Sequence, residues 1–162
     1  SHDGVPDIRI IVFRGVPVMA MTRLPTKASA GRANLHQGAV GAGIDLTTGR
    51  TNFAVIRTTP VDRHPDTHEA VVDFQIPQFA PALRAAIQAS DETGLGYVGA
   101  DIVIDSRYGA VVLELNARPG LAIQVANRAG LLPRLNAIRA RDTRELDLDA
   151  RIALGLELAE SC

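Results

Sequence analysis

The sequence is poor in residues that nucleic-acid-binding proteins use. Among its 162 residues there is no tryptophan, aromatic residues make up 4%, and Lys27 is the only lysine. The formal net charge is −1 at pH 7, so long-range electrostatics give no reason to expect binding to nucleic acid. The scarcity of aromatic rings also argues against a stacking platform for single strands. We therefore predict no nucleic-acid partner.

Cysteine and long apolar runs are scarce as well. The one cysteine, Cys162, is terminal and cannot form an internal disulfide, which fits a reducing cytoplasm. No apolar run approaches the roughly 20 residues needed to span a bilayer. A hydrophobic content of 46% is nevertheless enough for a packed core. We predict a cytoplasmic protein with no membrane span and a single domain over residues 1–162.

The order of strand-like and helix-like patterns predicts an α+β fold. Runs rich in Ile and Val, separated by glycine-containing turns, indicate antiparallel strands. Apolar residues at helical spacing indicate helices near the middle and at the end of the chain. We expect strands at 7–13, 16–22, 39–46, 53–57 and in the segment 96–116, and helices at 77–90, from 121 and at 147–160.

The segment Gly96 to Gly120 predicts a β-hairpin with a polar turn at 106–109. If Asp105 faces Ala110, the residue numbers of each further facing pair also add up to 215. Asp101 then lies opposite Glu114, and Gly99 lies opposite Asn116. Because side chains alternate between the faces of a strand, one face is then apolar and the other is polar. The expected apolar residues are Ala100, Ile102, Ile104, Val111, Leu113 and Leu115.

The polar face carries a candidate metal site formed by Asp101, Glu114 and Asn116. Two carboxylates and an amide oxygen are the hard ligands that Mg²⁺ prefers, whereas two facing carboxylates repel each other without a cation. Acidic residues on a hairpin usually just mark its solvent face. Asn is a poor strand residue, however, and its position beside Arg118-Pro119-Gly120 is more typical of a site.

The motif Glu114 to Gly120, preceded by Asp101, resembles the metal-binding end of ATP-grasp ligases. Upstream, the segments from Asp7 to Arg9 and from Gly31 to Gly38 resemble the glutamate-ligase branch, and in particular the alpha-L-glutamate ligase-like, sugar-transfer-associated proteins. The resemblance covers about residues 7–135. It implies the C-terminal ATP-grasp subdomain, a mainly antiparallel sheet with helices packed on one face.

The resemblance also implies ATP and Mg²⁺, or Mn²⁺, as cofactors and gives roles to individual residues. It places Asp7 near the ribose of the nucleotide, Arg32 and Asn34 at its phosphates, and Arg23 at the transferring phosphoryl group. Arg118 would clamp an acidic substrate. Each has a structural alternative: Arg32 and Asn34 as ordinary loop residues, Arg23 paired with a nearby acid, and Arg118 bonded to turn carbonyls. A second group, His64, Asp66 and His68, suggests a zinc site less strongly than plain solvent exposure.

Family members normally bring lysines to the nucleotide phosphates from a first half that is not recognisable here. We therefore expect a fragment, the C-terminal half of a ligase, whose partner is the missing N-terminal half; the alternative is a complete protein with a reduced fold. The implied reaction joins a carboxylate to an amine, with glutamate as the amino-acid or peptide substrate by analogy. A non-catalytic scaffold module and a Mg²⁺-dependent phosphohydrolase remain alternatives. Apolar surface left by the missing half could drive oligomerisation.

Overall fold

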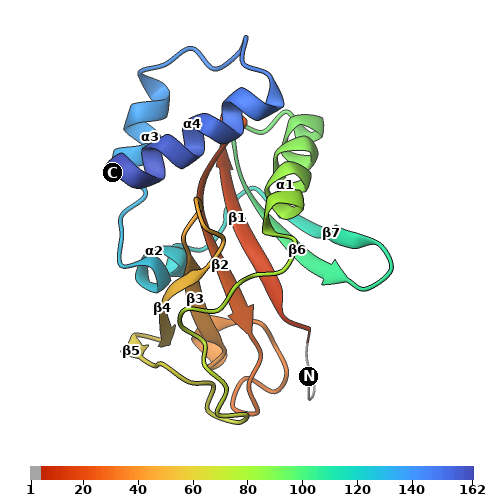
Figure 1. Cartoon of the computed structure of the whole chain (residues 1–162), viewed down its shortest axis with the longest axis vertical. Helices are drawn as coiled ribbons and strands as arrows, with labels where there is room; N and C mark the ends of the chain where they lie inside the picture. The colour runs from red at the N-terminus through yellow and green to blue at the C-terminus, as the bar shows by residue number, and fades with distance from the viewer. Residues whose placement is uncertain (1–4) are drawn as a thin grey trace.

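The computed structural model describes residues 5–162, which form one seven-stranded sheet and four α-helices (Figure 1). The strands are β1 (Asp7–Phe13), β2 (Val16–Leu24), β3 (Val40–Ile44), β4 (Thr51–Ile56), β5 (Thr59–Pro60), β6 (Tyr97–Asp105) and β7 (Gly109–Asn116). The helices are α1 (Phe79–Thr93), α2 (Ala122–Asn127), α3 (Leu132–Arg139), α4 (Leu148–Ser161) and the short 3-10 helix η1 (Leu35–Gln37). The α+β class predicted from the sequence is confirmed.

Every neighbouring pair of strands is antiparallel, in the order β5-β4-β3-β2-β1-β6-β7. Most neighbours are joined by short turns, but β1 pairs with β6 across more than eighty residues of chain. This non-local pairing places β1 inside the sheet, between β2 and β6, where its seven residues are all buried. The strand that begins with Asp7 therefore carries its charged residues into the interior of the fold.

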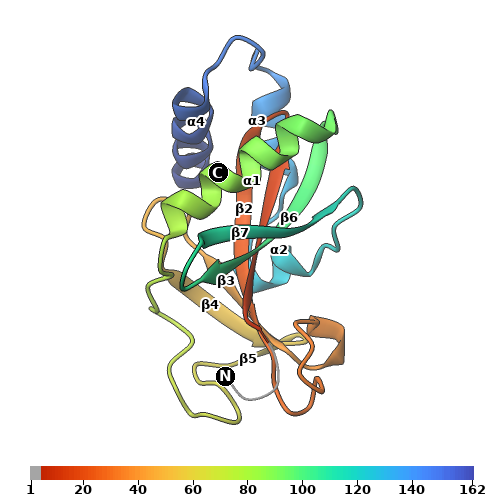
Figure 2. The same cartoon turned by 90° about the vertical axis from the view of Figure 1, so that its right-hand side faces the viewer.

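The helices cover both faces of the sheet. On one face, α1 packs against Ile8, Ile10 and Val12, while on the other α2 packs against Ile11 and Met21. Figure 2 shows α1 in front of the sheet and α2 behind it. The expectation of helices on one face was therefore too simple, because β1 carries apolar residues on both sides of its pleat and each side requires cover.

The helix α4 closes the end of the sheet at which β1 finishes. Its apolar residues contact both cores, Ile152 on one side and Leu158 on the other. Gly155 permits this approach, since a Cβ there would lie 2.5 Å from the carbonyl oxygen of Pro17. Within residues 5–162, no helix has the length and apolar character that a bilayer crossing requires.

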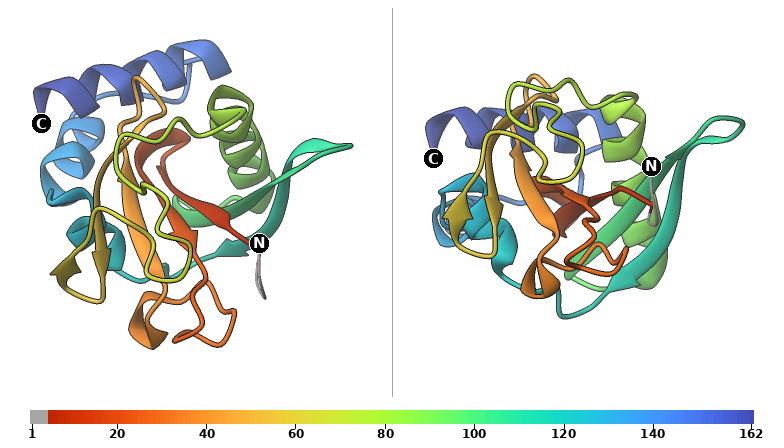
Figure 3. Two further views of the ribbon diagram at one scale, coloured as in Figure 1. Left: turned by 60° about the horizontal axis from the view of Figure 1, so that its bottom comes forward. Right: turned by 90° about the horizontal axis from the view of Figure 1, so that it is seen from below.

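The opposite end of the sheet carries long loops. The connections between β2 and β3 and between β5 and α1 lie there, beside the start of β1 (Figure 3). Several of their backbone groups are held by local side chains; for example, Thr26 Oγ1 donates to the carbonyl oxygen of Gly38 at 2.8 Å. His64 belongs to this loop layer, where its Nδ1 accepts from the backbone N–H of Asp66 at 3.2 Å. Its ring therefore orders a turn.

Candidate functional site

The hairpin β6–β7 brings two of the predicted metal ligands face to face. Asp101 lies opposite Glu114, and Gly99 lies opposite Asn116, as the sequence predicted. Directly opposed residues have Cβ atoms about 4.5–5.5 Å apart, so the two carboxylates share one face of the sheet. Gly99 leaves no open space beside this face, because a Cβ there would lie 2.7 Å from the Pro119 side chain.

Nearer the turn, the pairing differs from the prediction by one residue. Asp105 lies opposite Gly109 instead of Ala110, because Leu113 is the extra residue of a β-bulge. Leu113 is 61% exposed, and Val112 packs against the α1 core in its place. The bulge lies beside the pair formed by the two acids, so it changes the apolar face without changing the register at the candidate site.

Asp101 is held by two arginines of neighbouring strands. Arg9 on β1 donates from Nε to Oδ1 and from Nη2 to Oδ2, both at 2.7 Å, and Arg23 on β2 donates from Nη2 to Oδ2 at 2.8 Å. Arg9 and Asp101 face each other directly in the sheet. Both residues are buried, with exposed fractions of 9% and 5%. The candidate metal ligand is therefore also the centre of an ion-pair network.

Asp7 completes the network at the start of β1. It lies opposite Arg23, whose Nε donates to Oδ1 at 2.8 Å and whose Nη2 donates to Oδ2. Burial raises the pKa of the Asp7 carboxyl above its ordinary value, against the opposing effect of Arg23. Burial by itself would lower the pKa of Arg23, but the hydrogen bonds and charges of Asp7 and Asp101 outweigh it and raise that pKa. Arg23 thus pairs with nearby acids, which is the structural alternative left open for it, and the roles of Arg23 at the phosphoryl group and of Asp7 at the ribose stay predictions.

The four charges of this network, which we call the Asp7–Arg9–Arg23–Asp101 cluster, balance in pairs. Taking such groups out of water costs several kcal/mol per ion, which only good geometry and full hydrogen bonding offset. A buried cluster of this kind is weak evidence for stability but fixes the positions of its side chains. It places two arginine forks and two carboxylates on one face of the adjacent strands β2, β1 and β6.

Glu114 and Asn116 remain accessible beside this cluster. Glu114 is exposed, and its Oε1 accepts from Asn116 Nδ2 at 3.3 Å. This leaves Glu114 Oε2 and Asn116 Oδ1 without a hydrogen-bonded partner among residues 5–162. These two oxygens fit Mg²⁺, which takes one or two carboxylate-type ligands and completes its shell with water and phosphate. Asp101 fits as a third ligand only when the arginines release it.

No group of three His, Cys, Asp or Glu side chains suited to a metal is found in the described part of the chain. The predicted set of Asp101, Glu114 and Asn116 contains only two such side chains, because its third member is an amide. His64, Asp66 and His68 do not form such a group. Lys27 lies beside Asp66 in the loop layer, where its backbone N–H donates to Asp66 Oδ2 at 2.8 Å.

Arg32, Asn34 and Arg118 lie outside the ion-pair cluster. Arg32 is exposed in the loop before η1. Asn34 caps η1, and its Oδ1 accepts from the backbone N–H of His36 at 3.0 Å. Arg118 is exposed after β7, beside the buried Pro119. The nucleotide and substrate roles of these three residues stay predictions, and for Asn34 the structure also shows a local role in ending the loop.

Arg9 is the residue that the sequence analysis did not place in the site. A signal for it was present, because Asp7 and Arg9 stand two apart in an otherwise apolar strand and therefore share a face. What the local sequence does not contain is the pairing of β1 with β6. That pairing brings Arg9 to a carboxylate 92 positions away.

A comparison with family models gives this geometry a context. A model described as sugar-transfer associated ATP-grasp matches residues 1–140. The chain belongs to this ATP-grasp family. This membership agrees with the resemblance noted at the metal motif.

Among solved structures, the chain is similar to the ATP-grasp ligase PsnB complexed with minimal precursor. The two share 18% sequence identity with a TM-score of 0.42, over 84% of this chain and 34% of that chain. The chain thus spans about a third of the length of that ligase. No curated protein matches it.

Proposed function

We propose that this chain carries the metal-binding half of an ATP- and Mg²⁺-dependent carboxylate–amine ligase. The observation that carries the proposal is the face shared by Asp101, Glu114 and Asn116, flanked by Arg9 and Arg23, in a member of the ATP-grasp family. Oxygen ligands beside arginine forks are suited to a substrate that presents phosphate groups.

In this proposal the oxygen-bearing side chains bind the metal ion and the arginines bind the phosphoryl group. Glu114 and Asn116 hold Mg²⁺, and Asp101 joins them. The chemistry that Mg²⁺ supplies when bound is neutralisation of negative charge on the phosphates. Arg9 and Arg23 donate hydrogen bonds to the transferring phosphoryl group, for which their planar forks are suited. Binding of phosphate therefore competes with Asp101 for the same arginine donors.

The reaction proceeds in two displacements. A carboxylate oxygen of the substrate attacks the γ-phosphorus of ATP, and the bond to the β–γ bridging oxygen breaks, releasing ADP. An amine then attacks the carbonyl carbon of the acyl phosphate; the carbon–oxygen bond to phosphate breaks, and the departing phosphate takes the proton of the amine. The residues act by positioning and by electrostatic stabilisation of the phosphoryl group. Glutamate is the substrate by analogy, with Arg118 available to bind its carboxylate.

One observation favours a different function. Both oxygens of Asp101 already accept hydrogen bonds from arginine, which is the arrangement expected of a non-catalytic module that keeps the fold without turnover. A ligase requires this ion-pair network to open when nucleotide binds. The two functions therefore differ in whether Asp101 exchanges its partners.

The proposal is tested in the complete protein that contains this domain. ADP release is measured with ATP, Mg²⁺, glutamate and a panel of amines, and hydroxylamine is added to trap an acyl phosphate as a hydroxamate. We expect Glu114→Gln to lower ADP release by about 100-fold, in the range known for loss of one stabilising group. The matched control is Glu145→Gln, an exposed glutamate in the connection between α3 and α4.

The outcomes separate the three functions. A hydroxamate that depends on glutamate and on Glu114 supports the ligase. Phosphate release without any carboxylate substrate would identify a phosphohydrolase, and the absence of ADP release with every substrate would leave the non-catalytic module. The isolated 162-residue chain should bind Mg²⁺ weakly and should not ligate; robust ATP turnover by it would contradict the division of work given above.

A further inference from the structure

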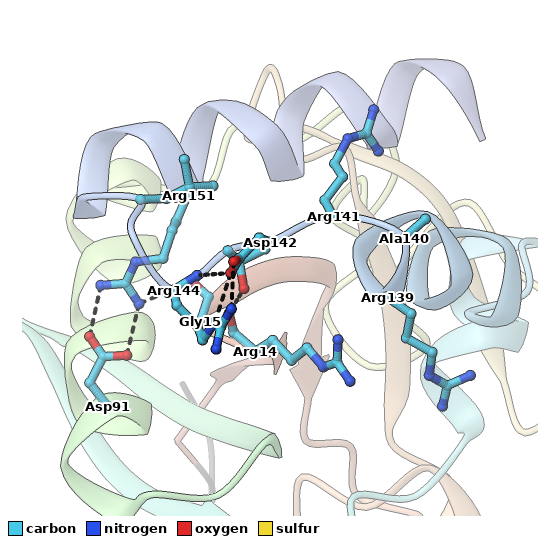
Figure 4. Close-up of a pocket in the computed structure, with 11 residues that line it drawn as sticks. Arg14, Gly15, Asp91, Arg139, Ala140, Arg141, Asp142, Arg144 and Arg151 are labelled. Carbon is cyan, nitrogen blue, oxygen red and sulfur yellow. Dashed lines mark hydrogen bonds and ion pairs between the residues drawn. The ribbon is translucent and has the colours of Figure 1, made fainter.

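A polar pocket lies at the far end of the sheet from the candidate metal site. It opens between the β1–β2 turn, the end of α1 and the connection from α3 to α4, with a volume of about 920 Å³ (Figure 4). Five arginines line it together with only two carboxylates, those of Asp91 and Asp142. The arginines are Arg14, Arg139, Arg141, Arg144 and Arg151. The pocket is therefore strongly positive although the chain as a whole is not.

Three of these arginines are committed to carboxylates. Arg151 binds Asp91 through two hydrogen bonds of 2.8 Å, and Arg144 binds Asp142 through two of 2.9 and 2.7 Å. Arg141 forms a longer contact with a glutamate of α4, at 3.3 Å. Figure 4 shows the Arg151–Asp91 pair beside α1 and the Arg144–Asp142 pair near the middle of the pocket.

The other two arginines, Arg14 and Arg139, have no acidic partner within residues 5–162. Both guanidinium groups lie against the same ring, 5.4 and 5.5 Å from the centroid of Phe13. Arg139 makes one further bond, from Nη1 to the neutral Oδ1 of Asn136 at 3.2 Å. Two cations this near to one ring lie close enough to repel each other, and a bound anion would reduce that repulsion.

The backbone at Arg14 is unfavourable for an arginine. Its φ is 49°, followed by 73° at Gly15, which is the turn geometry that favours Asn-Gly. The conformation is held by bonds from the Arg14 N–H to the carbonyl oxygen of Gly96 at 2.8 Å and from Thr143 Oγ1 to the Arg14 carbonyl oxygen at 3.2 Å. Strain of this kind persists where surrounding structure enforces it, and it often marks a ligand site.

We propose that this pocket binds a small phosphate-bearing molecule, with Arg14 and Arg139 donating to one phosphoryl group. Arginine forks form paired hydrogen bonds with phosphate oxygens, and the volume is that of an ordinary small-molecule pocket. Arg14 follows the end of β1 and is five residues after Arg9, so roughly 17 Å separates the two sites at about 3.3 Å per residue. The inference is thus independent of the proposed ligase activity.

The test measures binding of pyrophosphate to the 162-residue chain by calorimetry, at low salt and with EDTA present to remove divalent cations. We expect the variant that combines Arg14→Asn and Arg139→Gln to weaken binding by at least about tenfold, since it removes both of the charged donors. Asn suits the left-handed backbone at position 14, so the first change should not lower stability. Should the double variant fail to fold, each single variant serves in its place.

The control is Arg107→Gln. Arg107 is also an exposed arginine beside an aromatic ring, 5.5 Å from the Tyr108 centroid, but it lies in the β6–β7 turn away from the pocket. Binding that survives in Arg107→Gln and in Glu114→Gln supports the proposal. No binding by the unaltered chain, equal losses in Arg107→Gln, or tighter binding of citrate than of pyrophosphate would each overturn it. None of these results depends on turnover of ATP.

Discussion

The guanidinium of Arg9 and the carboxylate of Asp101 face each other across the central strands and are joined by two hydrogen bonds of 2.7 Å. This pair links the strand that starts the sheet to the hairpin that carries the metal motif. It also determines how much of Asp101 is available to a cation, because Arg9 occupies both of its oxygens.

Removal of Arg9 should be costly to the fold. Arg9→Met leaves the buried Asp101 carboxylate with Arg23 alone, and we expect the free energy of unfolding to fall by about 3 kcal/mol, as for other broken buried pairs. Arg9→Lys should restore only part of it, since an ammonium group cannot form the paired bonds. Urea denaturation measures both changes. Arg144→Gln, which breaks an exposed pair, should change the free energy of unfolding far less than Arg9→Met does.

Gly43 should be intolerant of any side chain. A Cβ at this position would lie 2.5 Å from the carbonyl oxygen of Ala126 and 2.7 Å from Asn127 Oδ1, so α2 would have to move. We expect Gly43→Ala to cost about 1–3 kcal/mol of unfolding free energy, as overpacking does. Gly96→Ala is the control, because a Cβ there meets nothing within 4 Å. Equal effects of the two changes would show that the α2 contact is not what excludes alanine.

The capping bond of Asn34 can be separated from its predicted role at the nucleotide phosphates. Asn34→Ala removes the acceptor for the His36 N–H, and we expect a loss of about 1 kcal/mol, the usual cost of a missing cap. Asn34→Asp retains the acceptor and should retain the stability, while adding a negative charge unfavourable to phosphate. Thermal unfolding with and without ATP distinguishes the two effects. A stability loss in Asn34→Asp as large as in the alanine variant would argue against capping.

Tyr97 should make stability decrease at high pH. Burial raises the pKa of its phenol above the ordinary value, so the unfolded chain ionises first. The contribution of Tyr97 is present below about pH 10 and is lost as the pH rises through the raised pKa of the folded state. The free energy of unfolding, measured by denaturation from about pH 8 to 11, should therefore fall more steeply with pH for the unaltered chain than for Tyr97→Phe. Parallel curves would mean that ionisation of Tyr97 is not linked to unfolding.

The elements near the candidate metal site could be predicted from local sequence. Alternation of apolar and polar residues places Asp101 and Glu114 on the same face, because the side-chain period of a strand is two. The β1–β2 hairpin follows in the same way from two apolar runs around Arg14-Gly15. Such patterns depend on residues a few positions apart, so local chemistry is enough to establish them.

The features that could not be predicted depend on contacts between segments that are distant in the sequence. The β-bulge at Leu113 has no marker in the sequence, and it arises where the hairpin packs against α1. The cover of both sheet faces was decided by where the helices after β7 return to the sheet. The two arginines on Phe13 come from a turn at 14 and a helix at 139.

The amino-acid sequence by itself thus determined the strands, the facing acids and the family, all of which are encoded at short range. Only the tertiary structure decided that Asp101 is bound to Arg9 and Arg23 and that five arginines surround one pocket. The physical reason is that strand pairing and helix docking are selected by burial of apolar surface over the whole chain. Charged side chains are then carried to neighbours that no local pattern specifies.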